Sequence, residues 1–295
     1  MRKISVYIPA YNSEEFLSRV IEGLLSQTLR ADEILVIDDG SLDSTAEIAA
    51  GYQDVTLIRH PKNKGLGAAR NTGIRAARNE LVASLDADCV PDPGWLAGLV
   101  RHFDDARLVG VGGRLIEGIQ RTVADRWRRA HMPQEWGDHP LRNPKFLFGC
   151  NNIFRKSAIM NVGGYDELMR TNGEDTHISR RLLDNGWDLL YDPEPQIVHL
   201  RHDTSRSILD TYWRWWRFGV RAYANEVRLR SVLGHALFVH FRQTFLDLIR
   251  KDLSAGRFEL LGLDLAILWY FPYRDFCLWL EEHPKTSSKH VSSEV

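Results

Sequence analysis

Short apolar runs alternate with helix-forming segments through the first 115 residues, and this alternation limits the folds open to the chain. The runs with the length and composition of buried strands are 4–8, 33–37, 55–58, 81–85 and 108–111. Between them, apolar residues recur at helical spacing, as Phe16, Val20 and Leu24 do. Strands joined by helices form a mostly parallel sheet with helices on both faces. We therefore expect an α/β fold with a Rossmann-like sheet.

Three helix starts in this region carry readable signals. Asn12 with Glu15, and Ser44 with Glu47, have the spacing of capping boxes. The small residues of 64–71 open a third helix, where a ligand can approach the backbone and the helix N-terminus favours an anion. A tightly packed Gly/Ala helix start explains the same residues equally well.

Beyond the fifth strand the pattern loosens. Residues 121–147 are rich in Arg, Trp, His and Pro and are expected to form a loop with a short helix. A strand from Asn151, an amphipathic helix over 174–186 and a strand over 197–200 follow, and the chain after Ser205 is helical and aromatic-rich. We expect an α/β domain over 1–204, a helical C-terminal extension over 205–280 and a disordered polar tail over 281–295.

Composition excludes some classes of function. The formal net charge of −1 over 295 residues argues against a nucleic-acid-binding protein. The three cysteines, Cys89, Cys150 and Cys277, are far apart and lack metal-type spacing. We expect them to be buried and reduced, as in a reducing compartment.

Apolar runs in this sequence are too short to span a membrane. No signal peptide is visible, and no run approaches the ~18–20 residues that a span needs. The nearest candidate, 260–280, is interrupted by Asp264, Pro272, Arg274 and Asp275. We expect a cytoplasmic protein that is soluble or peripheral to the membrane.

Residues 212–230 separate apolar and basic side chains onto neighbouring faces of one helix. The apolar set is Trp213, Trp216, Val220, Tyr223 and Val227, and the basic set is Arg214, Arg217, Arg221 and Arg228. Two interpretations stay open. The helix packs in a core, with its arginines on phosphate or carboxylates, or it contacts an anionic membrane surface peripherally.

Polar clusters follow three of the expected strands. They are Pro9-Ala10-Tyr11-Asn12, Asp38-Asp39 and Asp86-Ala87-Asp88. In sheets of this kind, ligands bind beyond the carboxyl ends of the strands. Topology alone therefore brings these three clusters to one edge.

Asp86 and Asp88 are the strongest chemical signal. Two carboxylates one residue apart repel and raise each other's pKa, and a divalent cation removes that cost. Mg²⁺ or Mn²⁺ needs only one or two protein carboxylates when phosphates and water complete its shell. The competing interpretation is a pair of turn or capping aspartates. Asp38 and Asp39 present a similar choice between an ordinary β-turn and a carboxylate that reaches a base or ribose.

A second acidic pair and a histidine lie downstream. Glu174 and Asp175 stand at a helix start, where acidic residues are ordinary dipole partners, but one of them can instead take a proton from a hydroxyl. His199 closes a strand; it is either structural or a third ligand beside a carboxylate-held ion.

Taken in order, these stretches resemble the family-2 glycosyltransferases, which have the GT-A fold. The matching stretches are Ser5–Asn12, Val36–Ser41, Gly67–Asn71, Asp86–Asp88, Gly163–Glu167 and Gly173–Asp175. The resemblance covers roughly residues 4 to 220. Each motif is only moderately specific, whereas all six in this order are highly specific.

The resemblance implies a role for each matching residue. The residues around the base, ribose and diphosphate of a UDP- or GDP-sugar would be Pro9, Ala10, Tyr11, Glu14, Asp39, Arg70, Asp86 and Asp88. Asp88 would hold Mn²⁺ or Mg²⁺, with His199 completing the metal or diphosphate site. Asp175 would be the catalytic base, and Glu174 would support the acceptor. Residues 1–204 would then be the catalytic domain.

The expected reaction is the inverting transfer of one sugar to a hydroxyl of a glycan or lipid-linked acceptor. Processive members of the family carry a Q-x-x-R-W motif, but only Arg214-Trp215-Trp216-Arg217 occurs here, without the glutamine. This departure favours a single sugar addition. Two alternatives remain: a sugar nucleotidyltransferase, and a non-catalytic interaction module with the same fold.

Overall fold

The computed structural model describes residues 2–219, 241 and 245–282. These residues form two compact units. The first consists of 2–204 and 214–219, and the second of 205–213 and the described residues from 241 onward. The predicted tail falls outside the described residues from 283 on.

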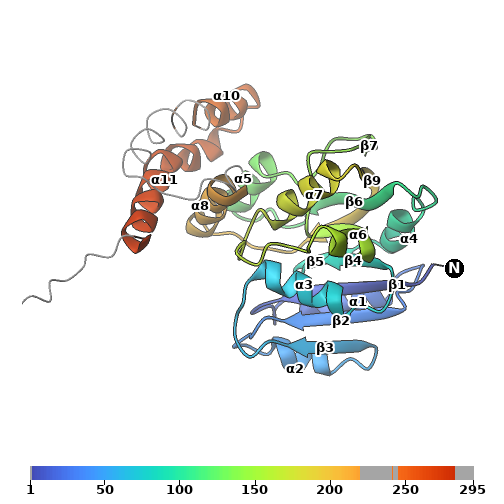
Figure 1. Ribbon diagram of the computed structural model, residues 1–295. Helices are drawn as coiled ribbons and strands as arrows, with labels where there is room; N and C mark the ends of the chain where they lie inside the picture. The colour runs from blue at the N-terminus through green and yellow to red at the C-terminus, as the bar shows by residue number, and fades with distance from the viewer. Residues whose placement is uncertain (1, 220–240, 242–244, 283–295) are drawn as a thin grey trace, which may run out of the picture. The chain divides into compact units, whose positions relative to one another are not determined.

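A nine-stranded sheet forms the centre of the first unit (Figure 1). Its strands are β1 (Ile4–Ala10), β2 (Glu33–Asp38), β3 (Val55–Arg59), β4 (Leu81–Leu85), β5 (Cys89–Pro91), β6 (Leu108–Glu117), β7 (Leu141–Arg142), β8 (Asn151–Arg155) and β9 (Asp188–His199). Their order is β3-β2-β1-β4-β8-β6-β9-β5, and β7 pairs with β9. The predicted α/β class is confirmed.

The sheet is mixed and not mostly parallel as expected. β3, β2, β1 and β4 run parallel, and so do β6 and β9. β8 is antiparallel to both β4 and β6, while β5 and β7 are antiparallel to β9. Parallel neighbours need a long crossover connection, and the regular strand–helix alternation that supplies it ends at β6. The strands that follow β6 in the sequence are parallel to some neighbours and antiparallel to others.

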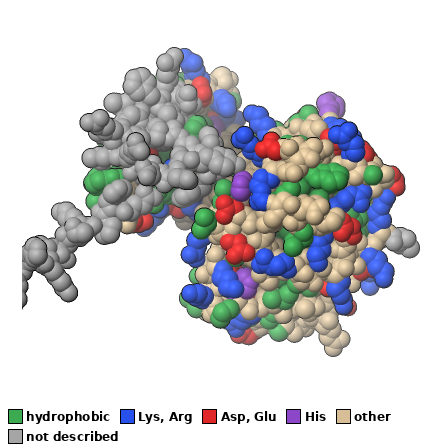
Figure 2. Space-filling view, in the orientation of Figure 1, with side chains coloured by type: hydrophobic (Ala, Val, Ile, Leu, Met, Phe, Trp, Pro, Cys, Tyr) green, Lys and Arg blue, Asp and Glu red, His purple; other side chains and the backbone are tan. Residues whose placement is uncertain are grey.

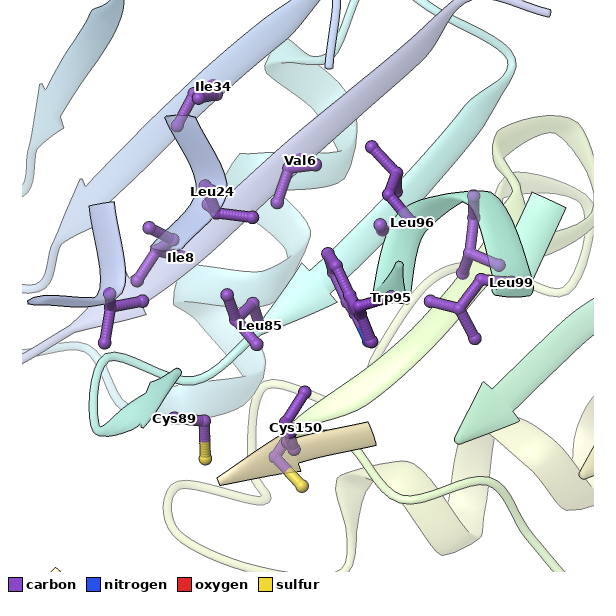
Figure 3. Close-up of a cluster of buried hydrophobic side chains, with 14 of the residues drawn as sticks. Val6, Ile8, Leu24, Ile34, Leu85, Cys89, Trp95, Leu96, Leu99 and Cys150 are labelled. Carbon is purple, nitrogen blue, oxygen red and sulfur yellow. The ribbon is translucent and has the colours of Figure 1, made fainter. Parts of the chain in front are cut away.

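Helices cover both faces of the sheet. In the first unit they are α1 (Leu17–Leu25), α2 (Thr45–Ala50), α3 (Leu66–Ala76), α4 (Trp95–Val100), α5 (Val123–His131), α6 (Lys156–Asn161) and α7 (Glu174–Asp184), and a π-helix spans Trp215–Gly219. On one face, α1 and α4 pack Leu24, Trp95 and Leu99 against Val6 and Ile8 of β1 (Figure 3). On the other face, α3, α6 and α7 pack against Tyr7, Ile37 and Val82.

The helix starts differ from the predicted capping boxes. Phe16 is the N-cap of α1, and Ser44 caps α2 without a side-chain hydrogen bond. Asn12 has a positive φ of 50° and accepts a hydrogen bond from Leu42 N–H instead. The side chain of Asn12, which its spacing from Glu15 predicted to cap α1, therefore forms a tertiary contact between two loops.

The second unit is helical. It contains most of α8 (Ser205–Arg214), together with α10 (Leu246–Ser254), a 3₁₀ turn (Phe258–Leu260) and α11 (Leu261–Glu282). None of the helices among the described residues is both long enough and apolar enough to cross a membrane. Of the predicted segment 212–230, only the part up to residue 219 is described, so the two-faced helix lies mostly outside the described residues.

Charges of both signs are interspersed on the surface. On the face shown in Figure 2, Lys and Arg side chains of the described residues lie among Asp, Glu and apolar side chains. This mixture agrees with the formal net charge of −1.

Candidate active site

The strand directions bring five chemically important positions to one edge of the sheet. Asp86 and Asp88 follow the carboxyl end of β4. Glu117 and His199 end β6 and β9, which pair in register at these two residues. β8 is antiparallel to β4, with Leu85 opposite Asn151, so Gly149, two residues before β8, lies at the same edge. The polar clusters therefore lie at one edge of the sheet, as predicted. Glu117 of β6, Gly149 just before β8 and His199 of β9 lie at the same edge.

Arg70 of α3 joins the two acidic pairs. Its side chain is only 1% exposed. Nη2 donates to Asp86 Oδ1 at 3.0 Å and Nε donates to Glu174 Oε1 at 3.1 Å. Nη1 donates to Ser84 Oγ and to the Gly149 carbonyl. Burial lowers the pKa of Arg70, but the carboxylates of Asp86 and Glu174 outweigh it and hold the pKa well above its usual range.

The two aspartates of the first pair have opposite pKa shifts. Burial raises the pKa of Asp86, and the charge of Asp88 adds to this, although Arg70 opposes it. Burial also favours the neutral form of Asp88, but His199 and Arg201 hold its pKa well below the usual range. Asp88 is therefore held in its ionised form, and its side chain is 30% exposed.

His199 is held between two carboxylates. Its Nε2 lies 3.2 Å from Asp88 Oδ2, and its Nδ1 lies 2.8 Å from Glu117 Oε2. Burial lowers the pKa of His199, but these carboxylates raise it to about 9. Glu117 was not found from the sequence, because its place beside His199 depends on the pairing of β6 with β9.

The residues predicted to hold a metal lie within reach of one ion. One ligand atom each from Asp88, Cys89 and His199 falls within 4.8 Å of the others. The carboxylate of Asp88 suits Mn²⁺ or Mg²⁺ when diphosphate oxygens and water complete the shell, and the imidazole of His199 adds one nitrogen donor. Cys89 is buried as predicted, but its place among these ligand atoms was not expected.

Glu174 and Asp175 begin α7 and differ in exposure. Gly173, at φ 88°, precedes them as the N-cap. Glu174 is buried against Arg70 at 3% exposure, whereas Asp175 is only partly buried. Asp175 Oδ2 accepts from Gly149 N–H at 3.1 Å, and Oδ1 accepts from Thr176 N–H at 2.7 Å. Burial raises the pKa of both groups, and the charge of Asp175 helps raise the pKa of Glu174 to about 7.

Gly149 is a site residue that the sequence did not reveal. A Cβ at this position would lie 2.6 Å from Arg70 Nη2 and 3.1 Å from Glu174 Oε1. Its N–H holds Asp175 and its carbonyl holds Arg70. A side chain at this position would force Arg70 or Glu174 to shift.

The residues expected around the nucleotide lie at the ends of β1 and β2. Pro9 and Ala10 are buried in β1, and Tyr11 is 45% exposed just beyond it. Glu14 is exposed, and its Oε2 accepts from Ser44 N–H at 3.0 Å. The loop after β1 is thus tied to the loop after β2.

Asp39 is buried and accepts three hydrogen bonds. Its partners are His60 Nδ1 at 2.6 Å, Lys64 N–H at 2.9 Å and Gly65 N–H at 2.8 Å. The next N–H, that of Leu66, donates to the Arg170 carbonyl. The glycine-rich start of α3 is therefore a packed helix start whose leading N–H groups bind protein oxygens. Asp39 holds this loop in place.

The family model described as Glycosyl transferase family 2 matches residues 5–168. The chain belongs to glycosyltransferase family 2. This confirms the resemblance based on the six motifs, and the model covers the first acidic pair and the loops after β1 and β2.

Curated relatives agree with this assignment. A pre-mycofactocin glycosyltransferase of Mycobacterium tuberculosis is 32% identical over 206 residues, which are 67% of this chain and 43% of that protein. Glycosyltransferase AglE of Haloferax volcanii is 30% identical over 197 residues, 64% of each chain. The chain thus spans 43% and 64% of the length of these two relatives.

Solved structures of glycosyltransferases share the fold. Mannosyltransferase PcManGT from Pyrobaculum calidifontis, in complex with GDP-Man and Mn²⁺, has a TM-score of 0.60 at 18% identity, covering 95% of this chain and 85% of that one. GalNAc-T7 with UDP, GalNAc and Mn²⁺ has a TM-score of 0.56 at 18% identity, covering 72% of this chain and 48% of that one. The predicted GT-A type of fold is confirmed.

Proposed function

We propose that the chain is an inverting, metal-dependent glycosyltransferase that moves one sugar from a nucleotide-sugar to an acceptor hydroxyl. Residues 1–204 carry the donor site and the catalytic groups. The observation that carries the proposal is the link through Arg70. Arg70 binds Asp86 at 3.0 Å and Glu174 at 3.1 Å. It therefore holds two acidic pairs beside each other: Asp86 and Asp88, the metal-ligand end of the site, and Glu174 and Asp175, the base end. A reaction in which a diphosphate leaves and a hydroxyl attacks needs both ends.

Asp88 and His199 are the proposed metal ligands. When bound there, Mn²⁺ or Mg²⁺ supplies Lewis-acid stabilisation of the charge on a leaving diphosphate. Asp88 is ionised and partly exposed, and Glu117 fixes the imidazole ring of His199 from behind. Asp86 is held by Arg70 and faces the same region.

Asp175 is the proposed base. Its carboxylate is partly exposed, and Gly149 N–H and Thr176 N–H hold it in one orientation. A raised pKa makes it a better proton acceptor than an ordinary aspartate once it is ionised. Glu174 is buried and binds Arg70, and we propose that it supports the acceptor site indirectly, by holding Arg70 and the first turn of α7 in place. One base and one displacement are sufficient for inversion.

The donor and acceptor follow from chemistry shared with relatives. The two structural neighbours bind GDP-Man and UDP with GalNAc, each with Mn²⁺, which supports a UDP- or GDP-sugar as the donor class. Family membership favours transfer of the sugar over synthesis of a nucleotide-sugar. We propose a glycan or lipid-linked acceptor.

The test is a panel of UDP- and GDP-sugars with the purified chain, in Mn²⁺ and in EDTA. We expect Mn²⁺-dependent release of the nucleoside diphosphate and a product whose anomeric configuration by NMR is opposite to that of the donor. Retained configuration would exclude the inverting mechanism. Pyrophosphate release from a nucleoside triphosphate would favour a nucleotidyltransferase, and a complete lack of turnover with bound donor would favour a binding module.

The second unit supports a proposal about where the acceptor lies. One face of α11 exposes apolar side chains spaced by three or four residues: Leu265, Trp269, Tyr273, Phe276 and Leu280. Trp269 is 82% exposed. Such a face, with Trp and Tyr in it, suits the interfacial region of a bilayer. We propose peripheral membrane contact through this face, with a membrane-proximal acceptor.

Liposome co-sedimentation tests this contact. We expect the wild type to pellet with anionic vesicles and Trp269→Glu to stay in the supernatant. Met160→Glu, a change of the same kind at an exposed position of α6, is the matched control and should pellet like the wild type. Equal recovery of all three proteins in the supernatant would exclude membrane contact. A shift of Trp269→Glu from dimer to monomer without liposomes would assign the face to a second copy of the chain.

A further inference from the structure

Cys89 and His199 face each other across two paired strands at the metal-ligand end of the site. Cys89 opens β5, which runs antiparallel to β9, and Cys89 is the register partner of His199. Side chains directly opposite in an antiparallel pair point to the same face of the sheet. Asp88 precedes Cys89 and is tied to β9 by its carbonyl, which accepts from Leu200 N–H at 2.8 Å. The strand pairing therefore holds all three side chains together.

The three side chains bring an oxygen, a sulfur and a nitrogen ligand atom close together. A carboxylate oxygen of Asp88, the sulfur of Cys89 and a ring nitrogen of His199 lie within 4.8 Å of one another. The Cys89 thiol is 3.5 Å from Asp88 Oδ1, and Nε2 of His199 is 3.2 Å from Asp88 Oδ2. A single ion can contact all three atoms without a change of strand register.

The surroundings of His199 match those of a metal-bound histidine. Glu117 Oε2 lies 2.8 Å from Nδ1, so Nδ1–H donates to a carboxylate and Nε2 faces Asp88 and Cys89. Carboxylate–histidine pairs of this kind orient imidazole ligands and fix their tautomer. The other oxygen of Glu117, Oε1, is buried and has no hydrogen-bond partner among the described residues. A cation at Nε2 would offset this concentration of negative charge.

The kind of ion follows from the donor atoms. Mg²⁺ and Mn²⁺ favour oxygen ligands, whereas thiolate and imidazole together with a carboxylate suit Zn²⁺ and its spectroscopic substitute Co²⁺. We infer that Asp88, Cys89 and His199 form a binding site for a thiophilic divalent cation of the Zn²⁺ class, with Cys89 as its thiolate ligand. The S–H bond of Cys89 breaks as the sulfur–metal bond forms, Nε2 of His199 loses its proton as this nitrogen binds the ion, and both protons pass to solvent.

This site shares Asp88 and His199 with the ion proposed for the transfer reaction. The two ions therefore compete, and Zn²⁺ acts as an inhibitor by occupying the ligands that a diphosphate-bound Mn²⁺ needs. Binding itself depends only on the three side chains. The inhibition rests on the proposed function.

The experiment is a Co²⁺ titration of the purified, chelator-treated chain without any sugar nucleotide. We expect a thiolate-to-cobalt charge-transfer band in the near ultraviolet that saturates at one ion per chain and disappears when Zn²⁺ is added. An excess of Mg²⁺ should leave the band in place. Cys89→Ser should lose the band, whereas Cys277→Ser, a matched change in the second unit, should keep it.

Thermal unfolding gives a second measurement that does not depend on spectroscopy. An ion that binds only the folded chain raises its melting temperature. Zn²⁺ should therefore raise the melting temperature of the wild type and of Cys277→Ser but not of Cys89→Ser. Equal melting temperatures of all three proteins in EDTA would show that Cys89→Ser is folded.

An unchanged band and unchanged Zn²⁺ stabilisation in Cys89→Ser would overturn the assignment of Cys89, and a wild type without the band would overturn the site itself. Neither result depends on turnover. Mn²⁺-dependent sugar transfer can persist while this site fails, and the band can be present in a chain that transfers no sugar.

Discussion

The two acidic pairs of the site, Asp86 with Asp88 and Glu174 with Asp175, share one partner and differ in the others. In each pair one carboxylate, Asp86 or Glu174, binds the buried guanidinium of Arg70. The other carboxylate, Asp88 or Asp175, has different hydrogen-bond partners. Asp88 meets the imidazole of His199, whereas Asp175 accepts from the neutral N–H groups of Gly149 and Thr176 and from the Thr176 hydroxyl.

This difference sets the protonation chemistry of each pair. A cationic partner keeps Asp88 ionised, as a metal ligand must be. Burial outweighs the hydrogen bonds to Asp175 and the charge of Arg70 and leaves Asp175 with a raised pKa, as suits the proposed proton acceptor. Arg70 binds one carboxylate of each pair, so one side chain holds the proposed metal ligands and the proposed base in a fixed relation.

The largest expected effect comes from breaking the metal end. Asp88→Ala removes an ionised ligand, and we expect it to abolish turnover, because a Lewis acid supplies several kcal/mol and each ~1.4 kcal/mol is a factor of about ten in rate. Donor binding should also weaken. The measurement is Mn²⁺-stimulated turnover together with donor affinity, and full activity of the variant in EDTA would remove Asp88 from the metal site.

Breaking the base end should leave donor binding intact. Asp175→Asn keeps the size of the side chain but cannot take a proton, so we expect kcat to fall by ~10²–10⁴. Donor and Mn²⁺ affinity should stay near those of the wild type, measured by calorimetry. If donor affinity collapsed while kcat held, Asp175 would belong to the donor pocket and the comparison of the two pairs would be wrong.

Local patterns predicted the first half of the sheet and the residues at the ends of its strands. Strand β4 has the predicted bounds, and the polar residues after β1, β2 and β4 lie at the predicted edge. These positions follow from short apolar runs and from the parallel connections between them. The same signals brought Asp86 and Asp88 to this edge, whereas Glu174 and Asp175 were visible only as an acidic pair at a helix start.

Residues that depend on the pairing of distant strands were not visible in the sequence. Glu117 and Cys89 flank His199 only because β6 and β5 pair with β9 in one register. A shift of one residue would turn these side chains to the other face, and no local pattern fixes that choice. The contacts of Arg70 with Asp86 and Glu174 span 16 and 104 residues of sequence, so no local pattern predicts them.

A smaller effect is expected at the junction of the two pairs. Gly149→Ala places a Cβ 2.6 Å from Arg70 Nη2, so the guanidinium must shift away from Asp86, Glu174 or both. Overpacking of this kind costs about 1–3 kcal/mol of stability, and we expect a loss of activity smaller than that of Asp175→Asn. Gly94→Ala is the matched control, because a Cβ there meets nothing within 4 Å. Urea unfolding and kcat measure both effects, and a Gly149→Ala variant equal to Gly94→Ala would show that Arg70 does not need this space.

The smallest expected effect is a shift in the pH profile. Asp175 must be ionised to act as a base, so kcat/KM should fall as pH falls through the apparent pKa of the Glu174–Asp175 pair. The raised pKa values, about 7 for Glu174, place this fall above the range of ordinary carboxyl groups. Glu174→Gln removes a like charge and leaves Arg70 with one fewer carboxylate, and both changes favour the ionised form of Asp175. The fall should therefore move to lower pH in Glu174→Gln. A wild-type profile that is flat down to pH values near 4, or a fall that moves upward in Glu174→Gln, would mean that the second pair does not supply the base.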